Sequence, residues 1–179
     1  MIVDVDATRR LILLRHAKSD WPDGVPDHER PLGERGRSEA PGAGRWLAER
    51  ELVPDLALVS SALRARQTWE LVAAELEAAA AADVPTRVED DLYDAAVWDV
   101  VVLLRTLPDD VATALVIGHN PGTERLALLL DDGTGPADDR ERMAGKFPTS
   151  GIAVLALQVP GWAELDAQTA RLEAFHVPR

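Results

Sequence analysis

Arginine and histidine side chains follow three separate apolar runs of the sequence. Arg15 and His16 come directly after the first run, Arg64 comes shortly after the second, and His119 comes just after the third. Continuous apolar runs of this length are typical of strands that are covered on both faces. Because ligands of an open α/β sheet bind beyond the carboxyl ends of its strands, we expect these four side chains to lie together at one edge.

Two arginines and two histidines at one place indicate a site for an anion. Crowded cations repel one another and lower each other's affinity for protons, unless a negative group lies among them. Guanidinium groups match phosphate oxygens in a bidentate geometry. A neutral histidine can attack phosphorus and leave again, while a protonated one donates to the phosphoryl group. Helices that begin after Ser61 and Pro121 would add backbone N–H donors. The pattern therefore predicts phosphoryl transfer.

Other catalytic chemistries lack their motifs in this sequence. There is no HExxH or HxH pattern, and no carboxylate stands at ligand spacing from His16 or His119, so a metal site is not expected. The GxxxxGK[ST] loop and the GxSxG elbow are also absent. Without cysteine, the chain has no disulfide, no thiolate zinc site and no cysteine nucleophile.

Length and charge define the broad class of the protein. We expect 179 residues to form a single domain, 1–179, with one sizeable core. The net charge of −12 argues against binding to nucleic acid or to an anionic membrane surface. Residues 1–66 carry 11 basic and 11 acidic side chains, so an anion site is expected in this balanced half. The lack of cysteine and of any long apolar segment favours a cytoplasmic location.

The chain alternates short apolar runs with helical patterns, which predicts an α/β domain with a mostly parallel sheet. The expected strands are 11–14, 56–59, 114–117 and 152–157, with weaker signals at 86–88 and 170–175. The expected helices are 45–50, 62–80, 97–107 and 123–130. Pro41, with Gly42 and Gly44, is expected to kink or split the first helix. The polar, Gly-rich segment 131–146 is expected to be a mobile loop.

Several motifs resemble one known family. The sequence RHAKS at 15–19 is similar to the RHG-type signature of the histidine phosphatase superfamily, in the variant of its small SixA-like branch. The supporting motifs follow in family order: RPLGERG (30–36), SSALRARQT (60–68), LYDA (92–95), GHNPG (118–122) and PTSGIAVL (148–155). The resemblance implies a three-layer α/β/α fold of the phosphoglycerate-mutase-like type.

The resemblance also implies roles for individual residues. His16 would attack phosphorus and form a phosphohistidine intermediate that water then hydrolyses. Arg15, Arg64 and His119 would hold the phosphoryl oxygens, so that no metal or other cofactor is needed. Ser19 could add a hydroxyl to the phosphate pocket or cap the following turn.

Two departures from the family pattern bear on the mechanism. Ala17 stands where the wider superfamily has glycine, close to the expected phosphate. Many members protonate the leaving oxygen with a carboxylate between the second Arg and second His motifs. Here Asp90 is the preferred candidate for that general acid, and a solvated acidic turn is the alternative reading. The other carboxylates of the segment are Glu89, Asp91 and Asp94.

Three functions stay open on the sequence alone. The first is a phosphatase for phosphohistidine in a protein, which suits a short chain and needs no strong general acid. The second is a phosphomonoesterase for small metabolites or nucleotides, which would need one. The third is a phosphate-binding regulatory module with little turnover. The substrate and the oligomeric state are not encoded in any motif.

Overall fold

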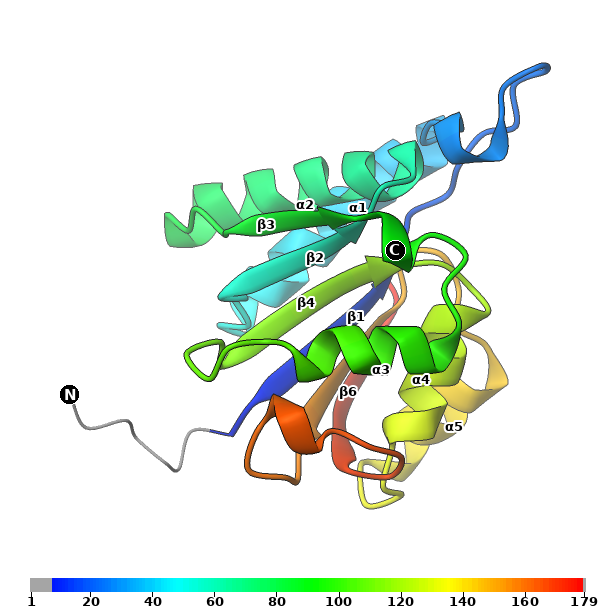
Figure 1. Ribbon diagram of the computed structural model, residues 1–179. Helices are drawn as coiled ribbons and strands as arrows, with labels where there is room; N and C mark the ends of the chain where they lie inside the picture. Colours follow the sequence, from blue (N-terminus) through cyan, green and yellow to red (C-terminus); the bar gives the residue numbers. More distant parts are fainter. Residues whose placement is uncertain (1–7, 179) are drawn as a thin grey trace.

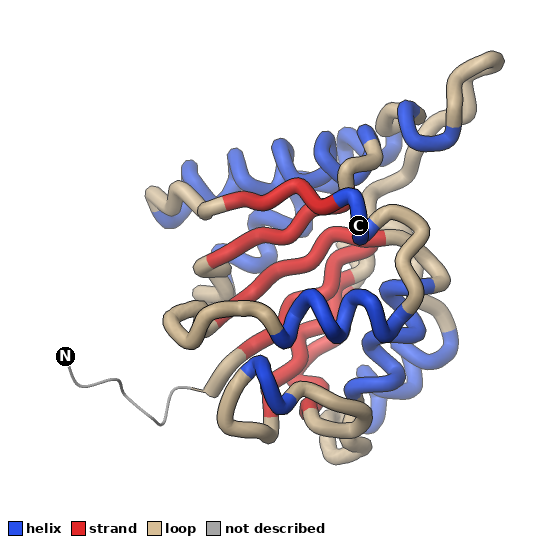
Figure 2. Tube along the Cα trace, in the orientation of Figure 1, coloured by secondary structure: helices blue, strands red, loops and turns tan. Residues whose placement is uncertain are grey.

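One mixed sheet forms the centre of the computed structural model, which describes residues 8–178 (Figures 1 and 2). Within these residues the sheet has six strands in the order β3-β2-β4-β1-β5-β6. The strands are β1 (Arg10–Arg15), β2 (Leu56–Ser60), β3 (Thr86–Glu89), β4 (Thr113–Gly118), β5 (Ile152–Leu157) and β6 (Ala170–His176). The first four are mutually parallel, whereas β5 runs antiparallel to β1 and β6 antiparallel to β5. The expected mostly parallel sheet is confirmed.

Helices cover both faces of the sheet and complete the three-layer α/β/α architecture (Figure 1). They are α1 (Glu34–Glu49), α2 (Leu63–Ala80), α3 (Val97–Arg105), α4 (Gly122–Leu130) and α5 (Ala137–Gly145), with 3-10 turns η1 (Asp27–Glu29), η2 (Asp90–Leu92) and η3 (Trp162–Glu164). The pair α1 and α2 packs on one face, and α3 and α4 pack on the other. Among the described residues, no helix is long and apolar enough to cross a membrane.

The alternation of side chains along β1 shows why its apolar run is continuous. Ile12 and Leu14 pack in the cluster beneath α1 and α2, and Leu11 and Leu13 pack in the cluster on the opposite face. Because both faces are covered, every position of the run is buried. Arg15, the last residue of the strand, is therefore the first one to leave the core.

The strand register brings the functional motifs together. Arg15 of β1 pairs with Gly118 of β4, and the backbone N–H of His16 donates to the carbonyl of Gly118 at 3.1 Å. Ile117 of β4 pairs in turn with Val59 of β2. The ends of these three parallel strands therefore meet at one edge, as the apolar runs predict.

The expected break in the first helix is wrong. Helix α1 runs unbroken through Pro41 and begins eleven residues before the expected segment 45–50. Its buried face packs tightly on α2, so that a Cβ added at Gly44 would lie 2.6 Å from the carbonyl oxygen of Val72. This tertiary packing outweighs the local cost of a proline inside a helix.

The expected loop at 131–146 is also wrong, because this segment contains α5. One apolar side chain of the helix, Met143, is fully buried. Polar contacts fix the rest: Arg140 pairs with Asp131 at 2.7 Å, and Asp139 accepts the backbone N–H of Phe175 at 3.0 Å. The polar composition hid a helix whose stability depends on contacts with distant parts of the chain.

Candidate active site

His16 is a buried, neutral imidazole with one nitrogen left free. Its Nδ1 lies 2.7 Å from the carbonyl oxygen of Ala17, which can only accept, so Nδ1 carries the proton. The pKa of His16 is lowered to about 3, chiefly by burial and further by the neighbouring charges of His119, Arg64 and Arg15. At neutral pH the lone pair of Nε2 is therefore available for attack on phosphorus.

His119 lies beside His16, with the ring centroids 5.0 Å apart and the planes inclined at 53°. Its Nε2 is 2.7 Å from the hydroxyl of Ser60, which can donate or accept and thus serves either protonation state. Nδ1 of His119 is buried and has no partner within the described chain. Burial, and after it the charge of Arg64, lowers the pKa of His119 to about 4.

Arg15 is held by the loop that precedes β5. Its Nη1 donates to the carbonyl of Phe147 at 2.9 Å, and the same oxygen accepts from the amide of Asn120 at 3.0 Å. Burial lowers the pKa of Arg15, and the nearby carboxylate of Glu124 counteracts this effect. Nε of Arg15 is buried without a partner among residues 8–178.

Arg64, in the first turn of α2, is held by Asp27. Its Nη1 donates to the Asp27 carbonyl at 2.6 Å and its Nη2 to the Asp27 carboxylate at 3.0 Å. The same carboxylate accepts from Arg30 and from the hydroxyl of Tyr93, each at 2.8 Å. Hydrogen bonds from Arg30 and Tyr93, then from Arg64, hold the pKa of Asp27 well below its usual range. Nε of Arg64 is again buried and unpartnered in the described part of the protein.

A pocket of about 220 Å³ brings these side chains together. It is lined by Arg15, His16, Lys18, Ser19, Trp21, Arg30, Arg64, His119, Asn120 and Thr149. The four residues that were expected to meet at the strand ends, Arg15, His16, Arg64 and His119, thus share one pocket. Ser19, the candidate phosphate-binding residue, lines the same pocket. The hydroxyl of Ser19 accepts a hydrogen bond from Nη2 of Arg30 at 2.6 Å, so it is already engaged.

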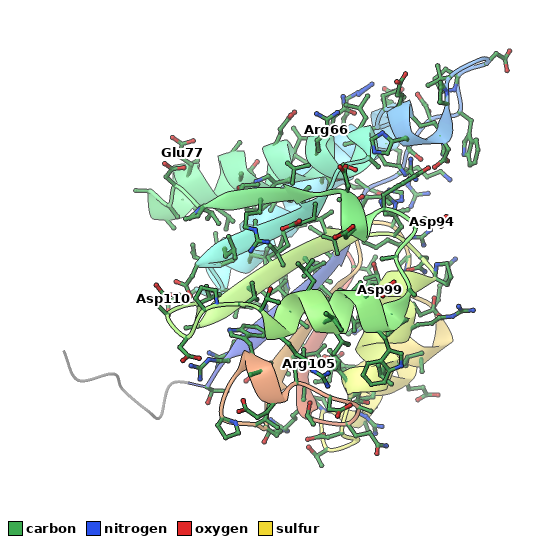
Figure 3. All side chains as sticks on the ribbon, viewed as in Figure 1. Arg66, Glu77, Asp94, Asp99, Arg105 and Asp110 are labelled. Atoms are coloured by element: carbon green, nitrogen blue, oxygen red, sulfur yellow. The ribbon has the colours of Figure 1, made fainter. Side chains whose placement is uncertain are left out.

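The candidate general acids lie outside this pocket. Asp90 and Asp91 are exposed in η2 and line a different surface hollow. Glu89 is paired with Arg87. Asp94 borders a separate cavity of about 370 Å³ that shares His119 and Asn120 with the pocket of His16. Figure 3 labels Asp94 in the loop between η2 and α3, on the side where the parallel strands end.

The backbone after His16 is fixed by contacts from α1 and α2. The N–H of Ala17 donates to the hydroxyl of Thr68 at 3.0 Å, so this amide is not free to bind phosphate. The carbonyl of Lys18 accepts from the N–H of Gly33 at 2.9 Å. A Cβ added at Gly36 would overlap the Lys18 carbonyl, which explains the need for glycine in the RPLGERG motif.

Several residues of the site were not identified from the sequence. Asp27 and Tyr93 lie in polar segments that have no periodicity, and nothing local connects them to Arg64. Ser60 is the last residue of β2 and follows an apolar run, a position that indicates a side chain at the edge of the sheet. Its partner His119 lies 59 residues further along the chain, so only the strand register shows the contact. Among residues 8–178, no group of three or more His, Asp or Glu side chains could hold a metal ion.

The ends of the parallel strands bring a neutral histidine and two arginines into one pocket, an arrangement suited to phosphoryl transfer, and comparison with known proteins supports this class. The family model for the histidine phosphatase superfamily (branch 1) matches residues 11–99. The chain belongs to the histidine phosphatase superfamily and is a phosphatase, a hydrolase of phosphorylated substrates.

Within the superfamily the chain falls in the SixA-like branch. A structure from Nakamurella multipartitia that bears the SixA name has a TM-score of 0.78 and 30% sequence identity, covering 96% of each chain. The protein histidine phosphatase SixA complexed with tungstate has a TM-score of 0.74 and 26% identity, covering 94% of this chain and 97% of the other. An uncharacterized protein of Mycobacterium tuberculosis is 45% identical over 93% of this chain and its own full length.

Proposed function

We propose that the chain is a metal-independent phosphatase that forms a phosphohistidine intermediate on His16 and acts on phosphohistidine in a protein. One observation carries the proposal. Four buried side-chain nitrogens lack partners in the described chain, and besides Nε of Arg9 they are Nε of Arg15, Nε of Arg64 and Nδ1 of His119. The last three belong to residues that line the pocket of His16. Buried donors are nearly always satisfied, so their partner is expected to be a bound phosphoryl group.

The proposed reaction has two steps. Nε2 of His16 attacks phosphorus, a bond from phosphorus to nitrogen of His16 forms, and the bond to the leaving group breaks as that group takes a proton. Water then attacks phosphorus, the bond to His16 breaks, inorganic phosphate is released and neutral His16 is regenerated. Arg15, Arg64 and His119 stabilise the charge on the transferring oxygens, which is the role that a metal ion would otherwise fill.

The form of the pocket supports a protein substrate. It is small and lies at the surface, with the exposed side chains of Lys18 and Trp21 on its lining. A histidine that projects from a partner protein can reach such a site. The solved relative described as a protein histidine phosphatase supports the same substrate class. The net charge of −12 supports the proposal that nucleic acid is not a partner, and the lack of cysteine supports the proposal that the protein acts in the cytoplasm.

The position of the carboxylates separates this proposal from an ester hydrolase. None of Glu89, Asp90, Asp91 and Asp94 lines the pocket of His16. The imidazole of a phosphohistidine leaves readily once it is protonated, whereas an alkyl alkoxide needs a strong acid. Asp90 stays a prediction as that acid. If the enzyme hydrolyses metabolite esters, single Asp→Asn variants at 90, 91 and 94 should lower that activity sharply at one position.

The test is a labelling and rate experiment. Wild-type protein, His16→Ala and the control His176→Ala are incubated with phosphohistidine protein, p-nitrophenyl phosphate and a panel of phosphorylated metabolites. His176 is a suitable control because it stacks on Trp46, with ring centroids 4.6 Å apart, and does not line the pocket. We expect an acid-labile, base-stable phosphoryl label on wild type and His176→Ala only, with the highest rate on phosphohistidine protein. Wild type without label or turnover on any substrate would favour a phosphate-binding module.

A further inference from the structure

Trp21 has the most exposed large apolar side chain in the described chain, with 73% of its surface accessible. A single exposed apolar side chain is common and by itself requires no explanation. Trp21, however, lies on the lining of the pocket that contains His16 and His119. In Figure 1 its segment, the blue loop between β1 and α1, extends outward beyond the body of the molecule.

Arg30 holds the indole of Trp21 from one side. The guanidinium carbon lies 3.1 Å from the ring centroid, over the face of the ring. Arg30 is itself 6% exposed, and all three of its nitrogens are bonded. Nε donates to the carbonyl of Asp20 at 2.9 Å, Nη1 to Asp27 at 2.8 Å and Nη2 to Ser19 at 2.6 Å. The indole therefore rests on a fixed base and leaves its other face open to solvent.

The volume of the pocket makes this open face relevant to the substrate. About 220 Å³ is less than the ~300–1,000 Å³ typical of pockets that enclose a small ligand. A phosphoryl group bound by Arg15 and Arg64 takes up part of that space, so the group attached to it must extend to the rim. On the lining, Lys18 and Trp21 are the exposed side chains. Lys18 offers a charge, and Trp21 offers a flat apolar surface.

We propose that Trp21 determines specificity by stacking on a planar leaving group, an imidazole or other aromatic ring, attached to the bound phosphoryl group. This inference rests on the proposed function only in placing the phosphoryl group beside His16. Offset or edge-to-face stacking of two aromatic rings adds to the effect of area burial, and a saturated ring of equal size lacks that contribution. The enzyme should therefore discriminate by the planarity of the leaving group.

The experiment measures binding directly, so it needs no turnover. Dissociation constants of phenylphosphonate, cyclohexylphosphonate and inorganic phosphate are determined by titration calorimetry for wild type, Trp21→Ala and Trp21→Phe. The control is Trp98→Ala, another exposed tryptophan (48%), which lies on α3 and does not line the pocket. Because Trp21 is exposed, the alanine variant should fold, and a thermal unfolding curve checks this.

We expect Trp21→Ala to weaken phenylphosphonate binding about 3- to 10-fold, the range of an aromatic pair. Cyclohexylphosphonate should change less, inorganic phosphate should not change, and Trp21→Phe and Trp98→Ala should resemble wild type. Equal losses for both ring compounds, or no loss for either, would overturn the proposal. If wild type binds neither phosphate nor phosphonates, the phosphoryl pocket itself is wrong, which is a failure of the proposed function.

Discussion

Arg64 and Asp27 are joined by two hydrogen bonds, of 2.6 Å to the carbonyl and 3.0 Å to the carboxylate of Asp27. Both use the terminal nitrogens of the guanidinium, so one edge of the group is occupied and Nε stays free. Asp27 thereby determines which edge of Arg64 can bind an anion. Since Asp27 also bonds to Arg30 and Tyr93, its carboxylate connects the β1–α1 loop with α2 and with the residue that follows η2.

The Asp27→Asn variant tests this orienting role. The amide is the same size as the carboxylate but neutral, so the side chain binds Arg64 and Arg30 less strongly. Arg64 then keeps its bond to the backbone carbonyl of residue 27 but is held less firmly in its orientation. We expect kcat/KM for p-nitrophenyl phosphate to fall about 10- to 100-fold, the range for a misplaced catalytic group. Asp109→Asn is the control, because Asp109 is an exposed partner of Arg9 at 3.7 Å and lies outside the pocket. Asp27→Asn kinetics equal to the control would contradict the role.

The Ser60→Ala variant tests the support of His119. Ser60 is fully buried, and its hydroxyl lies 2.7 Å from Nε2 of His119. Without this hydroxyl, Nε2 of His119 is buried and has no hydrogen-bond partner, which costs about 1–3 kcal/mol of free energy. We expect kcat to fall about tenfold or more, measured beside Ser38→Ala, whose hydroxyl bonds at the surface to the carbonyl of Arg35. Equal rates for the two variants would show that His119 needs no such support.

Acid should destabilise the protein through its two active-site histidines. In the folded state the pKa values are about 3 for His16 and about 4 for His119, against about 6.5 in an unfolded chain. As the pH falls from about 6.5 to about 4, the unfolded chain takes up protons that the folded chain does not, so the free energy of unfolding decreases. Above this window both histidines are neutral in both states and have no effect.

Urea unfolding at pH 7.5, 5.5 and 4.5 measures this dependence. Acidification also protonates carboxylates of the unfolded chain, whose pKa values are about 4. The comparison is therefore between wild type and His16→Gln, which cannot take up the proton. The variant should lose less stability on acidification than wild type. The same pH dependence in both proteins would show that His16 is not held neutral by burial.

Gly36→Ala tests the contact between α1 and the loop that follows His16. An added methyl would overlap the carbonyl of Lys18. This carbonyl belongs to the backbone and cannot move aside without moving the segment that follows His16. We expect a loss of about 1–3 kcal/mol in the free energy of unfolding and a marked fall in kcat. Gly145→Ala is the matched control, because nothing lies within 4 Å of a Cβ there. A Gly36→Ala protein as stable and active as the control would refute the contact.

The main outline of the sheet was predictable because each strand signal is local. The runs 11–14, 56–59, 114–117 and 152–157 lie within β1, β2, β4 and β5, and the weaker signals mark β3 and β6. Helix α1 and helix α5 were misjudged for a common reason. In α1 the packing on α2 outweighs the local cost of Pro41. In α5 the burial of Met143 and the bond of Asp139 to β6 outweigh the polar composition of 131–146.

The amino-acid sequence by itself predicted His16 as the candidate nucleophile and Arg15, Arg64 and His119 as its neighbours. A buried strand must end where its apolar run ends, so Arg15, His16 and His119 are delivered to one edge of a parallel sheet. Only the tertiary structure decided what holds them. Asp27 on Arg64 and Ser60 on His119 are contacts between residues 37 and 59 positions apart. Such contacts depend on loop paths and strand register, which no local pattern of residues encodes.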